Sequence, residues 1–227
     1  MKITSDHAFQ SLLAAALLMA APAGLRAQNA AAHYINQTTN TSVAIQGTST
    51  LHDWEMKGPL IGGFVDFPAG ISFDPGQTTL PGLKDGNLPA VVTARIPTKS
   101  IHSEAEIKAD IMDNLMRDAM RETNFHVIEY HLAELKLRQP HVAGQPFVFD
   151  AKGELAIAGV TNKVAFPVSI VPLEKNKIII SGTNDLKMTD YKIEPPAPNI
   201  GLGLMKCGDA VKILFKWTLI QNAPKQP

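Results

Sequence analysis

Alternating apolar and polar side chains near the C-terminal end constrain the fold more than any other feature of this sequence. In residues 211–219 every second residue is apolar, and most residues between them are polar, with Leu214 as the exception. Successive side chains of a β-strand point to opposite faces of its sheet, so this period predicts an antiparallel strand with one buried face. Residues 92–96 and 164–170 alternate in the same way. These segments predict a mainly β fold.

Further segments have the composition of strands, and short turns separate them. Runs of Gly, Pro, Asn and Asp, such as 74–76 and 84–87, are typical of turns between antiparallel strands. About eight strands with no alternating helices favour a single antiparallel sheet closed into a barrel, or a sandwich, over any parallel fold. The additional segments are 42–46, 54–67 with a kink near Gly62 and Gly63, 127–137, 147–157 and 177–186.

One segment has the periodicity of a helix instead. Apolar residues recur at three- and four-residue steps between 107 and 120, and Ser103 followed by Glu106 matches a capping box. We therefore predict one amphipathic helix from Glu104 to Glu122 that lies against the barrel. Thioether sulfurs at this spacing could bind Cu(I), but adaptable apolar packing is the favoured interpretation. The methionines of the stripe are Met112, Met116 and Met120.

The N-terminal region has the pattern of a secretory signal peptide. Residues 12–21 form an apolar run that is too short to cross a bilayer as a helix, and Pro22 and Gly24 interrupt the chain behind it. We expect cleavage before Gln28 and a soluble protein that is periplasmic or secreted, with no membrane span. The expected organisation is a signal peptide at 1–27, a flexible leader at 28–41 that could gain one strand at 33–35, and a single domain at 42–227.

Charge and cysteine content argue against several classes of protein. The chain has 21 basic and 21 acidic residues, so no surplus of positive charge favours nucleic-acid binding. Cys207 is the single cysteine, which excludes an internal disulfide, a thiolate zinc cluster and a Cys-x-x-Cys-His haem attachment. We expect no cofactor. An intermolecular disulfide of a homodimer, an exposed thiol and a buried inert thiol all stay open for Cys207.

The histidines give only weak signals for chemistry. His52 and Asp53 are adjacent, so on a strand they would point to opposite faces and would not form a catalytic pair. His126 and His131 also fall on opposite faces of a strand, which is poor geometry for a metal site, although a scattered site that includes His102 stays conceivable. We therefore predict neither a catalytic residue nor a metal ligand.

Three segments, taken in order, resemble the YceI-like family of exported polyisoprenoid-binding proteins. The last is the most specific, because Gly153-Glu154-Leu155-Ala156-Ile157-Ala158-Gly159-Val160-Thr161-Asn162-Lys163-Val164 is close to the family's G-x-L-T-I-x-G-V-T-x-x-V signature. The sequence departs from the family at Ala156, at His131 after Tyr130, and at Met120, where the family has Thr, Pro and often His. The other two segments are 47–54 leading to 63–67, and 117–125 followed by Tyr130.

The resemblance implies a lipocalin-like antiparallel barrel with an elongated apolar interior and no known catalytic apparatus. We therefore expect a non-enzymatic protein that holds a long apolar chain, such as a polyisoprenoid, a quinone tail or a fatty acyl group. A ligand-free structural or stress-response barrel and an isoprenoid-modifying enzyme are the alternatives. The residues expected to contact lipid share one parity within each strand or the helical stripe: Val92, Ala94, Ile96, Met112, Met116, Met120, Phe147, Phe149, Leu155, Val164, Phe166, Val168, Phe215 and Trp217.

Overall fold

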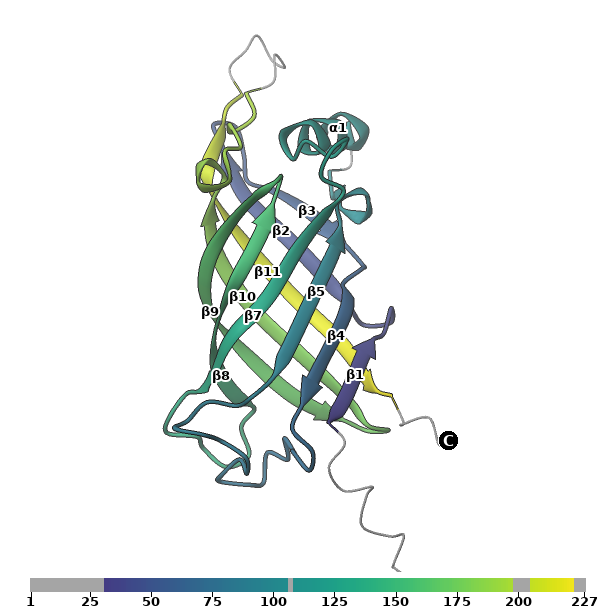
Figure 1. The fold of residues 1–227 in the computed structure, drawn as a ribbon. Helices are drawn as coiled ribbons and strands as arrows, with labels where there is room; N and C mark the ends of the chain where they lie inside the picture. Colours follow the sequence, from purple (N-terminus) through teal and green to yellow (C-terminus); the bar gives the residue numbers. More distant parts are fainter. Residues whose placement is uncertain (1–30, 106–107, 198–204, 223–227) are drawn as a thin grey trace, which may run out of the picture.

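The fold is an antiparallel sheet with an α-helix at one end (Figure 1). The computed structural model describes residues 31–105, 108–197 and 205–222 of the 227. The strands are β1 Ala32–Asn36, β2 Ser42–Ser49, β3 Trp54–Gly58, β4 Gly62–Phe67, β5 Val91–Pro97, β6 His102–Ser103, β7 Val127–Leu137, β8 Phe147–Ile157, β9 Val160–Leu173, β10 Lys177–Lys187 and β11 Cys207–Gln221. The helix is α1 Ala109–Ala119, and short 3-10 turns lie at Thr98–Ser100 and Met188–Tyr191.

The sheet closes into an eight-stranded barrel. The strands β1-β4-β5-β7-β8-β9-β10-β11 are hydrogen-bonded in that order, and β1 pairs back onto β11. These pairings are antiparallel, and most neighbours are consecutive in sequence. The remaining strands, β2, β3 and β6, extend the sheet from the other half of β11. The prediction of a barrel is confirmed, and the alternative of a sandwich is wrong.

Strand β1 lies within the segment expected to be a flexible leader. The strand suggested at 33–35 is present and closes the barrel between β4 and β11. Tyr34 is buried, and His33 Nδ1 on the opposite face donates a hydrogen bond to Asp66 Oδ1 at 2.5 Å. The alternation of buried and outward side chains therefore begins before residue 42. A segment this short gives a weak periodic signal, and its pairing with β4 on one side and β11 on the other holds it in place.

The helix is shorter than the sequence predicts. It spans Ala109–Ala119, with Lys108 in the left-handed region at φ 61° and no side-chain cap. Ser103 does not cap the helix, because it belongs to β6 and pairs with Met56 of β3. Glu106 and Ile107 lie outside the described residues. The capping-box pattern was a local match, and its serine forms part of the sheet instead.

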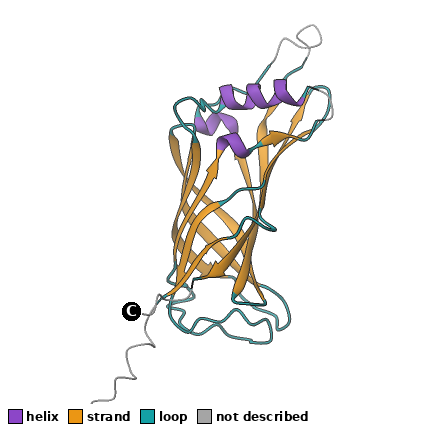
Figure 2. Cartoon of the chain, turned by 90° about the vertical axis from the view of Figure 1, so that its right-hand side faces the viewer, coloured by secondary structure: helices purple, strands orange, loops and turns teal. Residues whose placement is uncertain are grey.

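The two ends of the barrel are covered differently. At one end the long connection between β4 and β5 folds back inward and buries Phe73, Leu80 and Leu88. The Phe73 ring lies 4.9 Å from that of Phe67 and 6.3 Å from that of Phe149, so aromatic contacts plug this end. At the other end α1 crosses over the barrel mouth (Figures 1 and 2). The helix end is therefore the route by which a molecule could enter.

The structure explains why two positions of the 153–164 motif are glycine. A Cβ on Gly153 would lie 2.3 Å from the His131 carbonyl oxygen and 2.6 Å from the Tyr130 ring. Gly159 has φ +79° in the turn between β8 and β9, where the Phe125 ring packs on it. Only glycine combines this backbone conformation with such a close approach. The motif thus provides the turn of a hairpin at Gly159 and, at Gly153, the surface on which the Tyr130 ring packs.

We expect Gly153→Ala to destabilise the barrel by about 1–3 kcal/mol, because backbone and a packed ring must both shift. Urea unfolding at equilibrium measures the change in the free energy of unfolding. Gly62→Ala is the matched control, since its added Cβ would meet nothing closer than the Arg95 carbonyl oxygen at 3.6 Å. Equal stability of the two variants would contradict the close packing of Tyr130 on Gly153.

Candidate functional site

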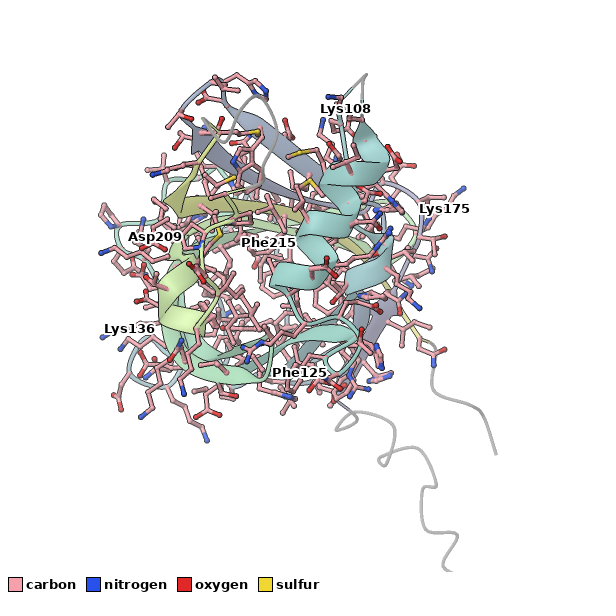
Figure 3. The ribbon with its side chains drawn as sticks, turned by 90° about the horizontal axis from the view of Figure 1, so that it is seen from above. Lys108, Phe125, Lys136, Lys175, Asp209 and Phe215 are labelled. Carbon is pink, nitrogen blue, oxygen red and sulfur yellow. The ribbon has the colours of Figure 1, made fainter. Side chains whose placement is uncertain are left out.

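The barrel encloses an apolar cavity of about 130 Å³. Its walls come from inward-facing side chains of most of the strands of the barrel, because successive residues of each strand alternate between interior and solvent. Viewed from the helix end, Phe215 lies within the ring of strands (Figure 3). We name this space the deep cavity. Of the residues expected to contact lipid, it is lined by Val92, Ala94, Ile96, Leu155, Phe166, Val168, Phe215 and Trp217.

A second cavity of about 110 Å³ lies beneath the helix, and we name it the mouth cavity. All three methionines of the predicted stripe, Met112, Met116 and Met120, point from α1 and its C-terminal end into this cavity. Met56, Met188 and Met205 also line it, from β3, the 3-10 turn after β10 and the segment before β11. The same side chains border both cavities, so the apolar surface continues from the mouth to the barrel interior. The shared residues are Ile45, Ile128, Ile157, Leu186 and Ile213.

Some of the expected contact residues lie elsewhere. Phe147 and Phe149 are fully buried, but they pack against Phe73 in the plug of the closed end and line neither cavity. Val164 is half-buried and lines neither cavity; its partner across the sheet is Gly153, where the Tyr130 ring packs. Parity gave the correct face, but it could not show that the plug and the tyrosine fill part of the interior.

Sequence reasoning missed two polar residues of the deep cavity, Tyr130 and Asn184. Tyr130 shares its parity with Ile128 and Leu132, so the alternation in that strand could have placed it inside. A register shift after Leu132 then moves the inward face to Leu135. Burial raises the pKa of Tyr130 far above its usual value, so the phenol stays neutral.

Comparison with a family model decides the classification. A model described as the YceI-like domain matches residues 34–219. The chain belongs to the YceI-like family. The resemblance seen in the three sequence segments is thereby confirmed. Comparison with curated proteins finds no match.

Solved structures share the YceI-like fold at low sequence identity. The crystal structure of BcnA from Burkholderia cenocepacia has a TM-score of 0.56 at 12% identity, covering 81% of this chain and 98% of that chain. A polyisoprenoid binding domain from Saccharophagus degradans, implicated in plant cell wall breakdown, has a TM-score of 0.56 at 15% identity, covering 85% and 100%. These likenesses support the fold.

A buried carboxylate anchors the helix of this YceI-like barrel. Asp113 is 8% exposed; it accepts hydrogen bonds from His102 Nδ1 at 2.7 Å and from the backbone amide of Ser103 at 2.6 Å. Arg117, one turn further along α1, lies 3.4 Å away. Burial acts to raise the pKa of Asp113, but the bonds from His102 and Ser103 and the charge of Arg117 bring it below its usual value. The ionised carboxylate thus ties α1 to β6.

We expect Asp113→Ala to detach α1, since a buried amide and the partner charges lose their acceptor. Because the folded pKa is lowered, the wild-type anchor is fully present above the unfolded carboxyl pKa of about 3.9 and is lost as pH falls through the lower folded value. Hydrogen exchange of α1 at pH 7 and at acid pH measures both effects. Asp118→Ala, an exposed carboxylate on the same helix, is the control. Protection of α1 that is equal in the two variants would contradict the anchor.

The side chains considered for catalysis or metal binding have other partners. His52 Nδ1 donates to the Asp53 backbone carbonyl at 2.7 Å, and the two side chains form no pair. His126 lies 3.2 Å from Glu122, and His131 lies near Thr93. Within residues 31–105, 108–197 and 205–222, no His, Cys, Asp and Glu side chains gather as three or more metal ligands.

Cys207 is half-buried and borders the mouth cavity. Burial raises the pKa of its thiol, which keeps the sulfur protonated and weakly reactive. In the described part of the chain no helix is both long and apolar enough to cross a membrane.

Proposed function

We propose that this protein binds a long apolar chain, such as a polyisoprenoid, a quinone tail or a fatty acyl group, inside its barrel. The observation that carries the proposal is the continuous apolar surface from the mouth cavity to the deep cavity. Apolar side chains form no hydrogen bonds with water. A hydrocarbon chain can therefore replace water beside them at a low cost in free energy. The similar domain from Saccharophagus degradans is described as polyisoprenoid binding, which supports the same ligand class.

The volumes set the length of chain that fits without rearrangement. An engineered cavity of about 150 Å³ in another protein holds one benzene molecule. The two cavities here, about 130 and 110 Å³, therefore match on the order of ten carbon atoms. Each buried methylene contributes about 0.8 kcal/mol, against an association cost of roughly 4–15 kcal/mol. A chain longer than this fits once the methionines repack, which their flexible side chains allow.

The experiment is extraction of ligand from protein purified without detergent. Denaturation in organic solvent followed by mass spectrometry is expected to recover a prenyl or acyl lipid in stoichiometric amount. A barrel that yields no lipid and binds no added prenyl or acyl chain would be a ligand-free structural protein, and the proposal would be wrong. The binding role is proposed to be non-enzymatic, so incubation with a polyprenyl substrate is expected to give no product.

We also propose that the protein is exported to the periplasm or secreted after removal of residues 1–27. The support is the apolar run at 12–21, which lies outside the described residues. N-terminal sequencing of the protein from the exported fraction is expected to begin at Gln28. An intact N-terminus in washed membranes would refute the proposal of export.

A further inference from the structure

The sulfur atoms of the described residues are gathered at one end of the barrel. Of the eight methionines of the chain, Met1 and Met19 lie outside the described residues, and all the others line the mouth cavity. The single cysteine, Cys207, borders the same cavity. In the view from the helix end, sulfur atoms, drawn in yellow, lie beside α1 (Figure 3). The methionines of the mouth cavity are Met56, Met112, Met116, Met120, Met188 and Met205.

Adaptable packing alone does not explain this distribution. Methionine fills irregular apolar space, so a protein that needs adaptable walls could place it wherever its ligand lies. The deep cavity is the larger of the two, yet none of the described methionines lines it. Its walls are aliphatic and aromatic, with one asparagine. Thioether and thiolate sulfurs share a different property, because both are soft ligands that prefer soft metal ions such as Cu(I).

Hydrogen bonds hold the 3-10 turn that carries Met188 against the start of β11, where Cys207 lies. Asp209 Oδ1 accepts a hydrogen bond from the Thr189 backbone amide at 2.9 Å, and Asp209 Oδ2 accepts one from the Thr189 hydroxyl at 2.8 Å. The β10–β11 ladder runs up to these residues. Met205 lies two residues before Cys207, and both line the cavity. Two thioethers and the thiol therefore come from neighbouring segments.

The helix presents further thioethers to the same space. Arg121, which follows Met120, donates a hydrogen bond from Nη2 to the Tyr191 carbonyl oxygen at 3.3 Å. This bond ties the end of α1 to the 3-10 turn that begins at Met188. Met116 packs in the same apolar cluster as Met120 and Met188. Elements that are far apart in the sequence thus bring their sulfur atoms to one cavity.

The charges around the mouth cavity favour a monovalent ion. Among the described residues that line it, Lys187 is the one with a charged side chain, and it is exposed to solvent. A metal replaces the proton of the Cys207 thiol, which leaves to solvent. One thiolate and one Cu(I) ion are neutral together, whereas a divalent ion would leave a net positive charge against apolar walls. Thioethers are also not among the ligands that Zn²⁺ prefers.

We propose that the mouth cavity is a soft-metal site that binds Cu(I) through the Cys207 sulfur and methionine thioethers. Met188 and Met205 supply thioethers from beside the cysteine, and Met116 supplies one from the helix. The metal would link α1, the 3-10 turn and β11 at the mouth of the barrel. This site goes beyond the proposed binding of lipid and does not depend on it.

The experiment is an anaerobic titration of the reduced, metal-free protein with Cu(I), in competition with bicinchoninate, a coloured Cu(I) chelator. We expect the protein to take one ion per chain from the chelator and to gain a thiolate-to-copper charge-transfer absorption in the ultraviolet. Copper K-edge X-ray absorption of the loaded protein is expected to give sulfur neighbours alone. Zn²⁺ at equal concentration is expected not to displace the bound Cu(I).

Variants identify the ligands. Cys207→Ser is expected to lose at least about a hundredfold in Cu(I) affinity, because loss of a mere outer partner of a metal ligand already costs about 10–100-fold. Met188→Leu/Met205→Leu keeps the apolar volume and is expected to lose at least about tenfold. Ile193→Val is the matched control. It removes one methyl group from the wall of the same cavity but no sulfur, so it is expected to bind Cu(I) as wild type does.

The outcomes separate a metal site from adaptable packing. Wild-type protein that takes no Cu(I) from the chelator, or bound copper with nitrogen or oxygen neighbours, would overturn the proposal. Wild-type Cu(I) affinity in the leucine variant would overturn it too, because the methionines would then serve packing alone. If Cys207→Ser fails to fold, the X-ray absorption of the wild-type protein still decides whether sulfur holds the metal. Binding of lipid is tested separately, so either proposal can fail without the other.

Discussion

Replacing Ala94 with Phe is expected to abolish binding of a long-chain lipid while the barrel stays folded. Ala94 lines the deep cavity from β5, opposite Tyr130 in the β5–β7 ladder. A phenyl ring there displaces about four methylene groups of the ligand, each contributing about 0.8 kcal/mol. The loss is therefore about 3 kcal/mol, or more than a hundredfold in affinity. The cavity of about 130 Å³ has room for the ring, so the protein itself is not overpacked.

The measurement is titration of a fluorescent prenyl probe, with circular dichroism and thermal melting on the same samples. Ala165→Phe is the matched control, because Ala165 is exposed on the outer face of β9. It is expected to bind the probe as wild type does. Unchanged affinity in Ala94→Phe would show that the lipid lies elsewhere, whereas loss of the cooperative melt would show that the cavity cannot accept the ring.

The strands of the barrel could be predicted because the signal of each strand is local. Alternation in 211–219, with Leu214 as the exception, indicates which face of β11 is turned inward, and the motif at 153–164 gives the hairpin between β8 and β9. Closure could not be predicted in this way. It depends on β1 pairing with both β4 and β11, and those contacts join residues far apart in the sequence.

The site was predicted less completely than the fold, and the reasons are physical. Parity tells inside from outside, but Phe147 and Phe149 are inside and still do not line a cavity, because Phe73 from a long loop fills the space beside them. Such a plug has no periodic signature. Tyr130 has the parity of an inward-facing residue, so the sequence could have placed it inside the barrel. The alternation could not show that its hydroxyl is buried without a hydrogen-bond partner.

The methionine stripe of α1 gives the last prediction. The double variant Met116→Glu/Met120→Glu is expected to release bound lipid at least about tenfold faster. Each new carboxylate would be held against an apolar surface, which costs several kcal/mol. Both methionines line the mouth cavity, and Met120 is 8% exposed among Met56, Ile101 and Tyr191. The helix can avoid that cost only by leaving the mouth. In both cases the free-energy barrier to release of the lipid falls.

The release rate of a fluorescent polyprenyl probe, measured by trapping in excess vesicles, checks this prediction beside thermal unfolding. Ile111→Glu/Asn114→Glu places the same two charges on the exposed face of α1 and is expected to release the probe at the wild-type rate. The barrel closes through strand pairing alone, without α1. The double methionine variant is therefore expected to keep a cooperative thermal unfolding transition. Equal release from both variants with unchanged melting would mean that α1 does not gate the mouth, since a methionine stripe that closes an entrance cannot accept two charges without opening it.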